Sequence, residues 1–203
     1  MKGQKMLGLL AKYPEPGFVK TRLACSVGEE RAAEVYRMIA ETVFRRTAPE
    51  AGEYGRVIFY DAVSGSGRFE NWLPGERLLP QRGGDIGAIM ANALGDLLCA
   101  GAERAVIAGV DIPGLEKRIV QNAFGLLGKK DVVIGPALDG GYYLIGMKTV
   151  HHALFEGIPW STAKVFGETV RTIGRLGLGY GTVETLSDLD QPEDIGRFPD
   201  LSL

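Results

Sequence analysis

The sequence has too little cysteine and histidine for the sites that these residues usually build. Its 203 residues include two cysteines, Cys25 and Cys99, and two histidines, His151 and His152. Two isolated cysteines give neither a disulfide framework nor a metal-binding spacing, so we expect a reduced, cytoplasmic setting. Adjacent histidines on a helix point to different faces, and they predict neither a metal pair nor a catalytic triad. Cys99 falls on an apolar helical stripe, where we expect a small core residue.

The sequence also lacks an excess of positive charge and a long apolar run. Its formal net charge is −2, whereas a broad nucleic-acid-binding surface requires a basic excess or stripe. The longest apolar runs are too short to span a bilayer, and no signal peptide precedes residues 6–11. We therefore expect a single domain over residues 1–203, with no nucleic acid partner and no membrane span.

Three common signatures of α/β enzymes are missing. No G-x-G-x-x-G follows the first expected strand, which makes a nicotinamide-binding Rossmann domain a poor fit. Gly17 stands three residues before Lys20, so no Walker A loop can be written. Residues 64–67 read SGSG, which is not the G-x-S-x-G of a serine-hydrolase elbow. The chemistry must therefore lie in other loops.

Short apolar runs alternate with helical patterns along the chain. We expect strands at 5–11, 56–60, 78–79, 105–108, 131–135, 142–147 and 182–186, and helices at about 28–46, 86–98, 116–127 and 161–176. This alternation predicts an α/β fold with a mainly parallel sheet and helices on both faces. A glycine turn at 139–141 indicates an antiparallel excursion within the sheet. Asp85 is the expected N-cap of its helix, and a short terminal helix is expected after 188–194.

The strand at 105–108 leads into an aspartate. Asp111 follows where that strand should end, before the turn at 113–114. Open α/β sheets bind ligands beyond the carboxyl ends of their strands, where a carboxylate can meet a metal ion and its phosphates. The alternative is that Asp111 caps the helix that begins near Glu116 or stabilises the turn.

Loops rich in cations and glycine follow the first and third expected strands. The loop at 12–22 reads KYPEPGFVKTR, and its cations are Lys12, Lys20 and Arg22. Its prolines stiffen the loop, and Gly17 lets the backbone approach a ligand closely. The loop at 81–87 reads QRGGDIG and contributes Gln81, Gly83 and Gly84. Cations beside a metal-holding carboxylate make a site for a diphosphate, whereas the alternative is a solvated surface loop.

Later segments supply a second set of candidates. Asp139 stands before Gly140 and Gly141, so its carboxylate can face an open cleft as a general base or a metal ligand. The alternative is a plain Asp-Gly turn between antiparallel strands. Trp160 indicates an acceptor pocket or an interface, or else core packing at the start of a helix that Ser161 caps. Asp188 and Asp190 are interpreted as turn and helix-start residues, with a position near the metal as the alternative.

Six segments resemble the successive motifs of one family. They are KYPEPGFVKTRL, PQRGGDIG, GVDIPGL, GPALDGGYYLIG, FEGIPWST and LSDLDQPEDI. They look like those of the bacterial glycosyltransferase-like proteins called selenodomain-associated transferases, in the nucleotide-diphospho-sugar transferase superfamily. The resemblance covers nearly the whole chain and implies a GT-A-type (Rossmann-like) fold with a divalent cation, Mg²⁺ or Mn²⁺, held by Asp111. Two features depart from related enzymes: Asp111 is followed by Ile112 and Pro113 rather than forming the D-x-D of glycosyltransferases, and a proline-rich loop replaces the glycine-rich first loop of nucleotidyltransferases.

These features together predict a metal-dependent transferase that acts on an activated nucleotide and an acceptor. Glycosyl transfer from a nucleoside diphosphate sugar is the first hypothesis, and the alternatives are a nucleotidyltransferase using a nucleoside triphosphate and a nucleotide-binding module without turnover. The nucleotide-binding residues are then Ala11, Lys12, Gly17, Lys20, Arg22, Gln81, Gly83 and Gly84. Asp111 and Asp139 hold the metal, and Asp139 and Lys20 carry the catalysis. The acceptor side comprises Gly140, Gly141, Trp160 and Ser161.

Overall fold

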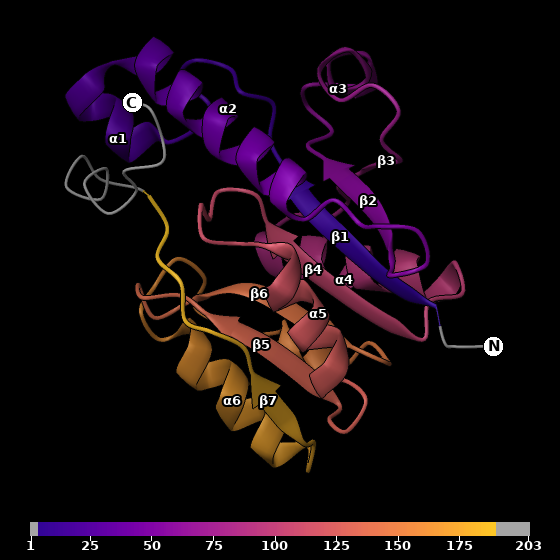
Figure 1. Cartoon of the computed structure of the whole chain (residues 1–203). Coiled ribbons are helices and arrows are strands. Elements are labelled where there is room, and N and C mark those ends of the chain that lie inside the picture. Colours follow the sequence, from indigo (N-terminus) through magenta and orange to yellow (C-terminus); the bar gives the residue numbers. More distant parts are fainter. Residues whose placement is uncertain (1–3, 190–203) are drawn as a thin grey trace.

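Seven strands form one sheet in the computed structural model, which describes residues 4–189 (Figure 1). In chain order they are β1 (Lys5–Ala11), β2 (Gly55–Tyr60), β3 (Leu78–Pro80), β4 (Arg104–Gly109), β5 (Val132–Pro136), β6 (Tyr142–Met147) and β7 (Tyr180–Thr182). Their order across the sheet is β3-β2-β1-β4-β6-β5-β7. β6 runs antiparallel to β4 and β5, and the other pairings of these strands are parallel. The predicted α/β sheet with an antiparallel excursion is confirmed.

Apolar residues on both faces of the central strands explain why helices cover both sides of the sheet. In β1, Leu7 and Leu9 belong to one core cluster, whereas Met6 belongs to the other. β4 divides in the same way between Val106 and Ile107. Successive residues of a strand point to opposite faces, so a continuous apolar run needs a core on each side.

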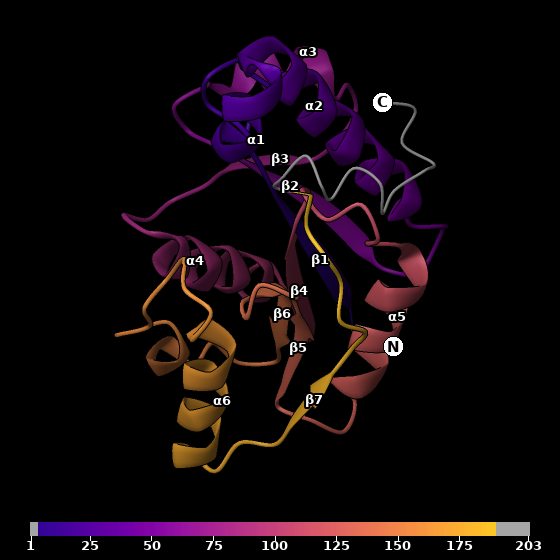
Figure 2. The same ribbon diagram turned by 90° about the vertical axis from the view of Figure 1, so that its left-hand side faces the viewer.

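The helices form two layers, one on each face (Figure 2). The layer over the Leu7 cluster comprises α1 (Thr21–Val27), α2 (Glu29–Arg46), α3 (Ser66–Trp72) and α5 (Lys117–Leu126). The opposite layer comprises α4 (Ile86–Cys99), the 3₁₀ helix η1 (His152–Leu154) and α6 (Val165–Arg175). Asp85 is the N-cap of α4, as predicted, and accepts a hydrogen bond from the Ala88 N–H at 2.7 Å. Within residues 4–189, no helix combines the length and the apolar character that crossing a bilayer requires.

Two short α-helices are absent from the sequence prediction. α1 begins inside the segment that the prolines of loop 12–22 indicate as irregular, and Gly28, with φ 86°, separates it from α2. α3 buries a single residue, Phe69. Seven residues make only about two helical turns, which is too little for an apolar period to show in the sequence.

Other predictions are wrong in their boundaries or burial. α6 begins after Ser161 rather than at it, because Ser161 has φ 63°, which no right-handed helix contains. β7 precedes most of the strand expected at 182–186. Cys99 is exposed because it is the last residue of α4, beyond the buried part of the helix. The helix expected after 188–194 lies outside the described residues.

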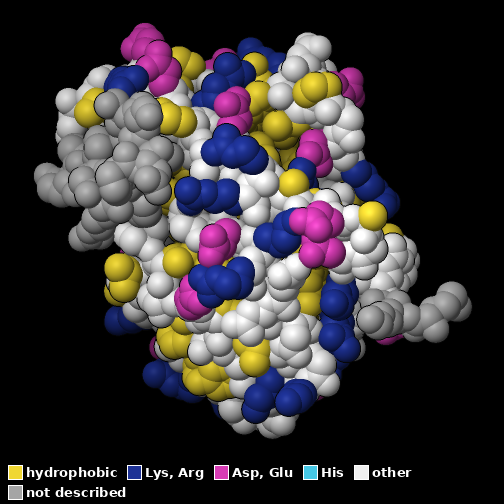
Figure 3. Space-filling model, in the orientation of Figure 1, with side chains coloured by type: hydrophobic (Ala, Val, Ile, Leu, Met, Phe, Trp, Pro, Cys, Tyr) yellow, Lys and Arg dark blue, Asp and Glu magenta, His cyan; other side chains and the backbone are white. Residues whose placement is uncertain are grey.

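Ion pairs connect α5 to the segments beside it. Lys117 Nζ lies 3.0 Å from a Glu50 carboxylate oxygen and 3.4 Å from one of Glu53. Arg118 Nη2 donates to a Glu184 carboxylate oxygen at 3.0 Å. Figure 3 shows that basic and acidic side chains are interspersed on this face of the molecule. Exposed pairs contribute at most about 1 kcal/mol each, so the two apolar clusters supply most of the stability.

Gly146, on β6, is packed too closely to tolerate a side chain. A Cβ atom there would lie 2.7 Å from Val106 Cγ2 and 2.9 Å from the Ala105 carbonyl oxygen. We expect Gly146→Ala to lower the free energy of unfolding by about 1–3 kcal/mol.

A Cβ at Gly95, in the middle of α4, would meet no atom outside its own helix within 4 Å. Gly95→Ala should raise the free energy of unfolding by about 0.5–1 kcal/mol, since glycine is a poor helix former. Urea unfolding measures the free energy of unfolding of both variants. A Gly146→Ala protein with the same transition midpoint as the unmodified protein would contradict this account of β6.

Candidate functional site

A pocket of about 490 Å³ opens at the edge of the sheet where β1 and β4 end. Figure 2 shows the molecule from this side. The pocket is lined by the loop after β1, the start of α4, the end of β4, the turn before β6 and the loop before α6. Open α/β sheets bind ligands at this edge because several strand-end loops converge there.

A tyrosine of α2 holds the start of the loop after β1. The Tyr36 hydroxyl accepts a hydrogen bond from the Lys12 N–H at 2.9 Å and donates one to the Lys12 carbonyl at 3.2 Å. Burial raises the pKa of Tyr36 far above its usual value, so the hydroxyl keeps the proton that it donates. The backbone of Lys12 is thereby fixed, while its side chain remains exposed at the pocket.

Two polar side chains connect the ends of β1 and β2. The Asp61 carboxylate accepts a hydrogen bond from the Tyr13 N–H at 2.8 Å. The Gln81 amide donates to the carbonyls of Ala11, at 3.0 Å, and Phe59, at 2.8 Å. Both amide hydrogens of Gln81 therefore serve the protein itself, and its first role is to support the strand ends beneath the pocket.

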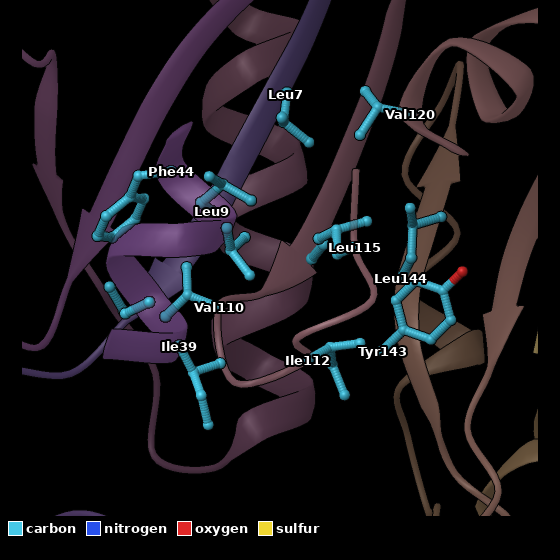
Figure 4. Close-up of a cluster of buried hydrophobic side chains, with 14 of the residues drawn as sticks. Leu7, Leu9, Ile39, Phe44, Val110, Ile112, Leu115, Val120, Tyr143 and Leu144 are labelled. Atoms are coloured by element: carbon cyan, nitrogen blue, oxygen red, sulfur yellow. The ribbon is translucent and has the colours of Figure 1, made fainter. Parts of the chain in front are cut away.

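Buried neighbours on both sides present Asp111 to the pocket. Val110 and Ile112 are 1% and 4% exposed, and Figure 4 shows both within the apolar cluster. A Cβ atom at Gly109 would lie 2.8 Å from Asp111 Oδ1, so glycine at this position leaves room for the carboxylate. The N-cap of α5 is Glu116. The alternative that Asp111 caps this helix is therefore wrong.

Lys20 lines the same pocket and forms an ion pair with Asp111. Its Nζ lies 3.6 Å from Asp111 Oδ2, and the Lys20 side chain is 3% exposed, compared with 47% for Asp111. The backbone of Lys20 has φ 46° and ψ 44°, in the left-handed region that lysine rarely adopts. Arg22, in α1, also lines the pocket. The loop after β1 thus brings positive charge to the carboxylate that follows β4.

The turn between β5 and β6 carries Asp139 to the pocket. Asp139 Oδ1 accepts a hydrogen bond from the Gly141 N–H at 2.8 Å, and Gly140 has φ 88°. The Gly140 carbonyl accepts from the Phe166 N–H at 3.0 Å, and a Cβ at Gly140 would collide with the Ala163 carbonyl. The Asp-Gly turn is therefore locked against the start of α6. It leaves the Asp139 side chain exposed in the pocket lining.

Aromatic side chains form the pocket wall on the side of α4 and α6. The rings of Tyr142 and Trp160 meet edge to face, with centroids 6.2 Å apart and an interplanar angle of 78°. The Trp160 indole packs on the first turn of α4, where a Cβ at Gly87 would lie 2.6 Å from the ring. Ser161 lines the pocket but does not cap α6, whose N-cap is Lys164. Trp160 is half-buried and lines the pocket while it packs on the core.

The structure brings most of the predicted site residues together. Those in the pocket lining are Ala11, Lys12, Lys20, Arg22, Gln81, Asp111, Asp139, Gly141, Trp160 and Ser161. Four predicted glycines are not part of the lining: Gly17, which faces Glu29, Gly83 and Gly84, which are exposed ahead of α4, and Gly140. Asp188 joins the lining. Asp190 lies outside the described residues.

Tyr36 and Asp61 shape the site without being predicted from the sequence. Tyr36 falls on the apolar stripe of α2, where a tyrosine is typical of core packing and its hydroxyl carries no separate signal. Asp61 directly follows β2 in the run RVIFYD. It therefore has the same signal as Asp111, a carboxylate at the carboxyl end of a buried strand.

Comparison with known proteins identifies the family. The model of the family DUF2064, described as "uncharacterized protein conserved in bacteria", matches residues 44–162. A crystal structure from Desulfovibrio desulfuricans G20, provisionally named a nucleotide-diphospho-sugar transferase, is 34% identical in sequence. It superposes with a TM-score of 0.87, over 93% of this chain and 83% of that one. No curated protein matches the sequence.

Two more distant structures share the fold. CMP:2-keto-3-deoxy-manno-octonic acid synthetase, complexed with CTP, superposes with a TM-score of 0.61 at 11% identity, over 98% of both chains. A 4-diphosphocytidyl-2C-methyl-D-erythritol synthase superposes with a TM-score of 0.56 at 13% identity, over 99% of both chains. At such identities the likeness concerns the fold alone. The family model and the Desulfovibrio relative together show that the chain belongs to the DUF2064 family and has the nucleotide-diphospho-sugar transferase fold.

Proposed function

We propose that the protein is a transferase that uses an activated nucleotide, with a nucleoside diphosphate sugar as donor and Mg²⁺ or Mn²⁺ as cofactor. The observation that carries this proposal is a single pocket lined by cations, by carboxylates and by an aromatic wall. The provisional name of the 34%-identical relative supports the same class of reaction.

The cations of the loop after β1 would bind the diphosphate. Lys12 and Arg22 have exposed side chains in the pocket lining, and Lys20 is held inward beside Asp111. Lysine and arginine form short, charge-assisted hydrogen bonds with phosphate oxygens. The carbonyl of Ala11 and the backbone of Lys12 already bond within the protein. These two residues would therefore contact the nucleoside by packing against it rather than through backbone hydrogen bonds.

The oxygen atoms of the pocket suit a hard divalent cation. Asp111 has a half-exposed carboxylate with space beside it at Gly109, and Asp139 offers another. Within residues 4–189, no group of three or more His, Cys, Asp or Glu side chains could hold a metal ion. Mg²⁺ commonly binds through one or two carboxylates, substrate phosphates and water, so Asp111 alone would suffice once a nucleotide is present. The bound cation would supply charge stabilisation to the departing nucleoside diphosphate.

Asp139 would accept a proton from the acceptor. Its Oδ1 accepts a hydrogen bond from the Gly141 N–H. Oδ2 would therefore take the proton of the acceptor hydroxyl while the hydroxyl oxygen attacks the sugar and the nucleoside diphosphate leaves. The locked turn keeps the carboxylate in place during this step. Tyr142 and Trp160, next to it in the lining, would bind the acceptor and exclude water.

Nucleotidyl transfer is the second candidate, and one sequence feature favours it. Asp111 is followed by Ile112 and Pro113, so Asp111 is not part of the D-x-D of many glycosyltransferases. The fold is also shared with the octonic acid synthetase and the erythritol synthase described above. The two reactions release different products, because a nucleoside diphosphate sugar yields a nucleoside diphosphate and a triphosphate yields pyrophosphate.

Thermal stabilisation and product release test the proposed function together. Nucleoside diphosphate sugars and nucleoside triphosphates are added singly, with and without Mn²⁺. We expect a diphosphate sugar to raise the Tm in a Mn²⁺-dependent manner and to release nucleoside diphosphate slowly in water. Pyrophosphate release would favour the second candidate, and binding without any product would indicate a binding module. No stabilisation by any of these nucleotides would overturn the proposal.

Arg22→Ala tests the phosphate-binding side of the pocket. It should weaken binding of a nucleoside diphosphate by about 1–3 kcal/mol, through loss of a charge-assisted hydrogen bond, and leave binding of the nucleoside unchanged. Arg31→Ala is the matched control, because Arg31 lies on α2, outside the pocket lining, and pairs with Glu34 at 2.9 Å. Titration calorimetry measures both ligands. Equal losses for nucleoside and nucleotide would mean that the substitution only disturbs the loop.

Asp139→Asn separates catalysis from turn formation. Asparagine keeps the size and the turn preference but cannot take up a proton, so we expect the same Tm and similar donor affinity. Turnover, including donor hydrolysis, should fall by at least about 100-fold, as expected for the loss of a general base. Turnover at the rate of the unmodified protein would leave Asp139 as a turn residue alone.

A further inference from the structure

The backbone of Lys20 is in the strained left-handed conformation, and its ammonium group lies beside Asp111. Lys20 and Ser161 are the two non-glycine residues with positive φ in the described part of the chain. The Lys20 carbonyl accepts a hydrogen bond from the Ala24 N–H at 2.9 Å, which ties this conformation to the first turn of α1. Strained conformations of this kind persist where the surrounding structure enforces them, and they concentrate at functional sites.

The resulting ion pair is unequal in its exposure. The Lys20 side chain is 3% exposed, whereas that of Asp111 is 47% exposed, with 3.6 Å between Nζ and Oδ2. Burying an ammonium group is costly unless it is paired, so Lys20 depends on a nearby negative charge. Asp111, by contrast, is open to the pocket and can exchange one positive partner for another.

We infer that the Lys20 ammonium is a resident counter-charge for Asp111, and that diphosphate binding transfers it from the carboxylate to a phosphate. This inference rests on the proposed function. Lys20 beside Asp111 repels a divalent cation that approaches the same carboxylate, so the empty pocket binds the metal weakly. When a diphosphate binds, Lys20 pairs with its negatively charged oxygens instead of with Asp111. The Asp111 carboxylate can then bind the metal. Metal and nucleotide then bind cooperatively, each strengthening the other.

Mn²⁺ binding without nucleotide tests this exchange directly. Lys20→Gln removes the competing charge, and we expect it to bind Mn²⁺ about tenfold more tightly than the unmodified protein, a coupling of ordinary size. Lys20→Arg keeps the charge and should stay close to the unmodified affinity. Arg22→Gln removes a charge of the same pocket and should change the affinity by less than about threefold, as a general electrostatic effect would. The electron paramagnetic resonance signal of free Mn²⁺ gives the affinity of each variant.

Pyrophosphate affinity, measured without metal, distinguishes an exchange from a damaged pocket. In Lys20→Gln we expect pyrophosphate to bind more weakly while Mn²⁺ binds more tightly. A merely structural role for the Lys20–Asp111 pair would weaken both. Lys20→Asn repeats the test with a residue that tolerates the left-handed region, so that a folding defect in Lys20→Gln cannot decide the result.

The outcomes also separate this inference from the proposed function. The inference is overturned if Lys20→Gln binds Mn²⁺ no more tightly than the unmodified protein, or if Arg22→Gln gives the same gain. If both proteins bind Mn²⁺ equally, and Asp111→Asn abolishes that binding, the metal site stands and only the exchange fails. If neither binds Mn²⁺, with or without pyrophosphate, the metal dependence in the proposed function fails as well.

Discussion

The parallel pairing of β1 with β4 is the constraint on which the candidate site depends. Their register runs from Lys5 opposite Arg104 to Leu10 opposite Gly109, so the two strands end level with each other. The Val110 N–H donates to the Leu10 carbonyl at 3.3 Å and extends this alignment beyond the strands. As a result, the loop after β1 and the segment that carries Asp111 leave the sheet side by side. A shift of one residue would put Leu7 or Leu9 in the place of Gly8, where even a Cβ atom would lie 2.8 Å from the Phe59 ring, so core packing and site geometry are specified together.

The antiparallel direction of β6 brings the remaining part of the site to the same edge. In a sheet of parallel strands, the segment that follows each strand lies at the carboxyl edge. For β6 the segment that precedes it lies there, since Leu144 pairs with both Ala108 of β4 and Gly135 of β5. The turn with Asp139 and the aromatic wall with Tyr142 can therefore face Asp111 across one pocket. One reversed strand thus joins the cation side of the pocket to its opposite wall.

Strand ends could be predicted from the sequence better than the contacts made around them. Asp111 and Asp139 stand next to unbroken apolar runs, so the position of each at the sheet edge follows from local pattern alone. The support that Tyr36 gives to Lys12 depends on how α2 packs against β1, a contact between residues 24 positions apart. Gly83 and Gly84 resemble a phosphate-binding loop in sequence, yet they lie exposed outside the lining, and a Cβ at Gly83 would lie 2.7 Å from the Ile89 nitrogen of α4. Serine is a common N-cap residue, but Ser161 has a positive φ, and α6 begins only at Val165.

The central proposal is that this pocket binds a nucleoside diphosphate together with a divalent cation held by Asp111. Anomalous diffraction from crystals grown with Mn²⁺ and a nucleoside diphosphate tests it most directly. The account predicts a manganese peak about 2 Å from an Asp111 carboxylate oxygen, a usual metal–oxygen distance, with the phosphates facing Lys20 and Arg22. Manganese bound elsewhere, or a nucleotide seated outside the pocket, would contradict it.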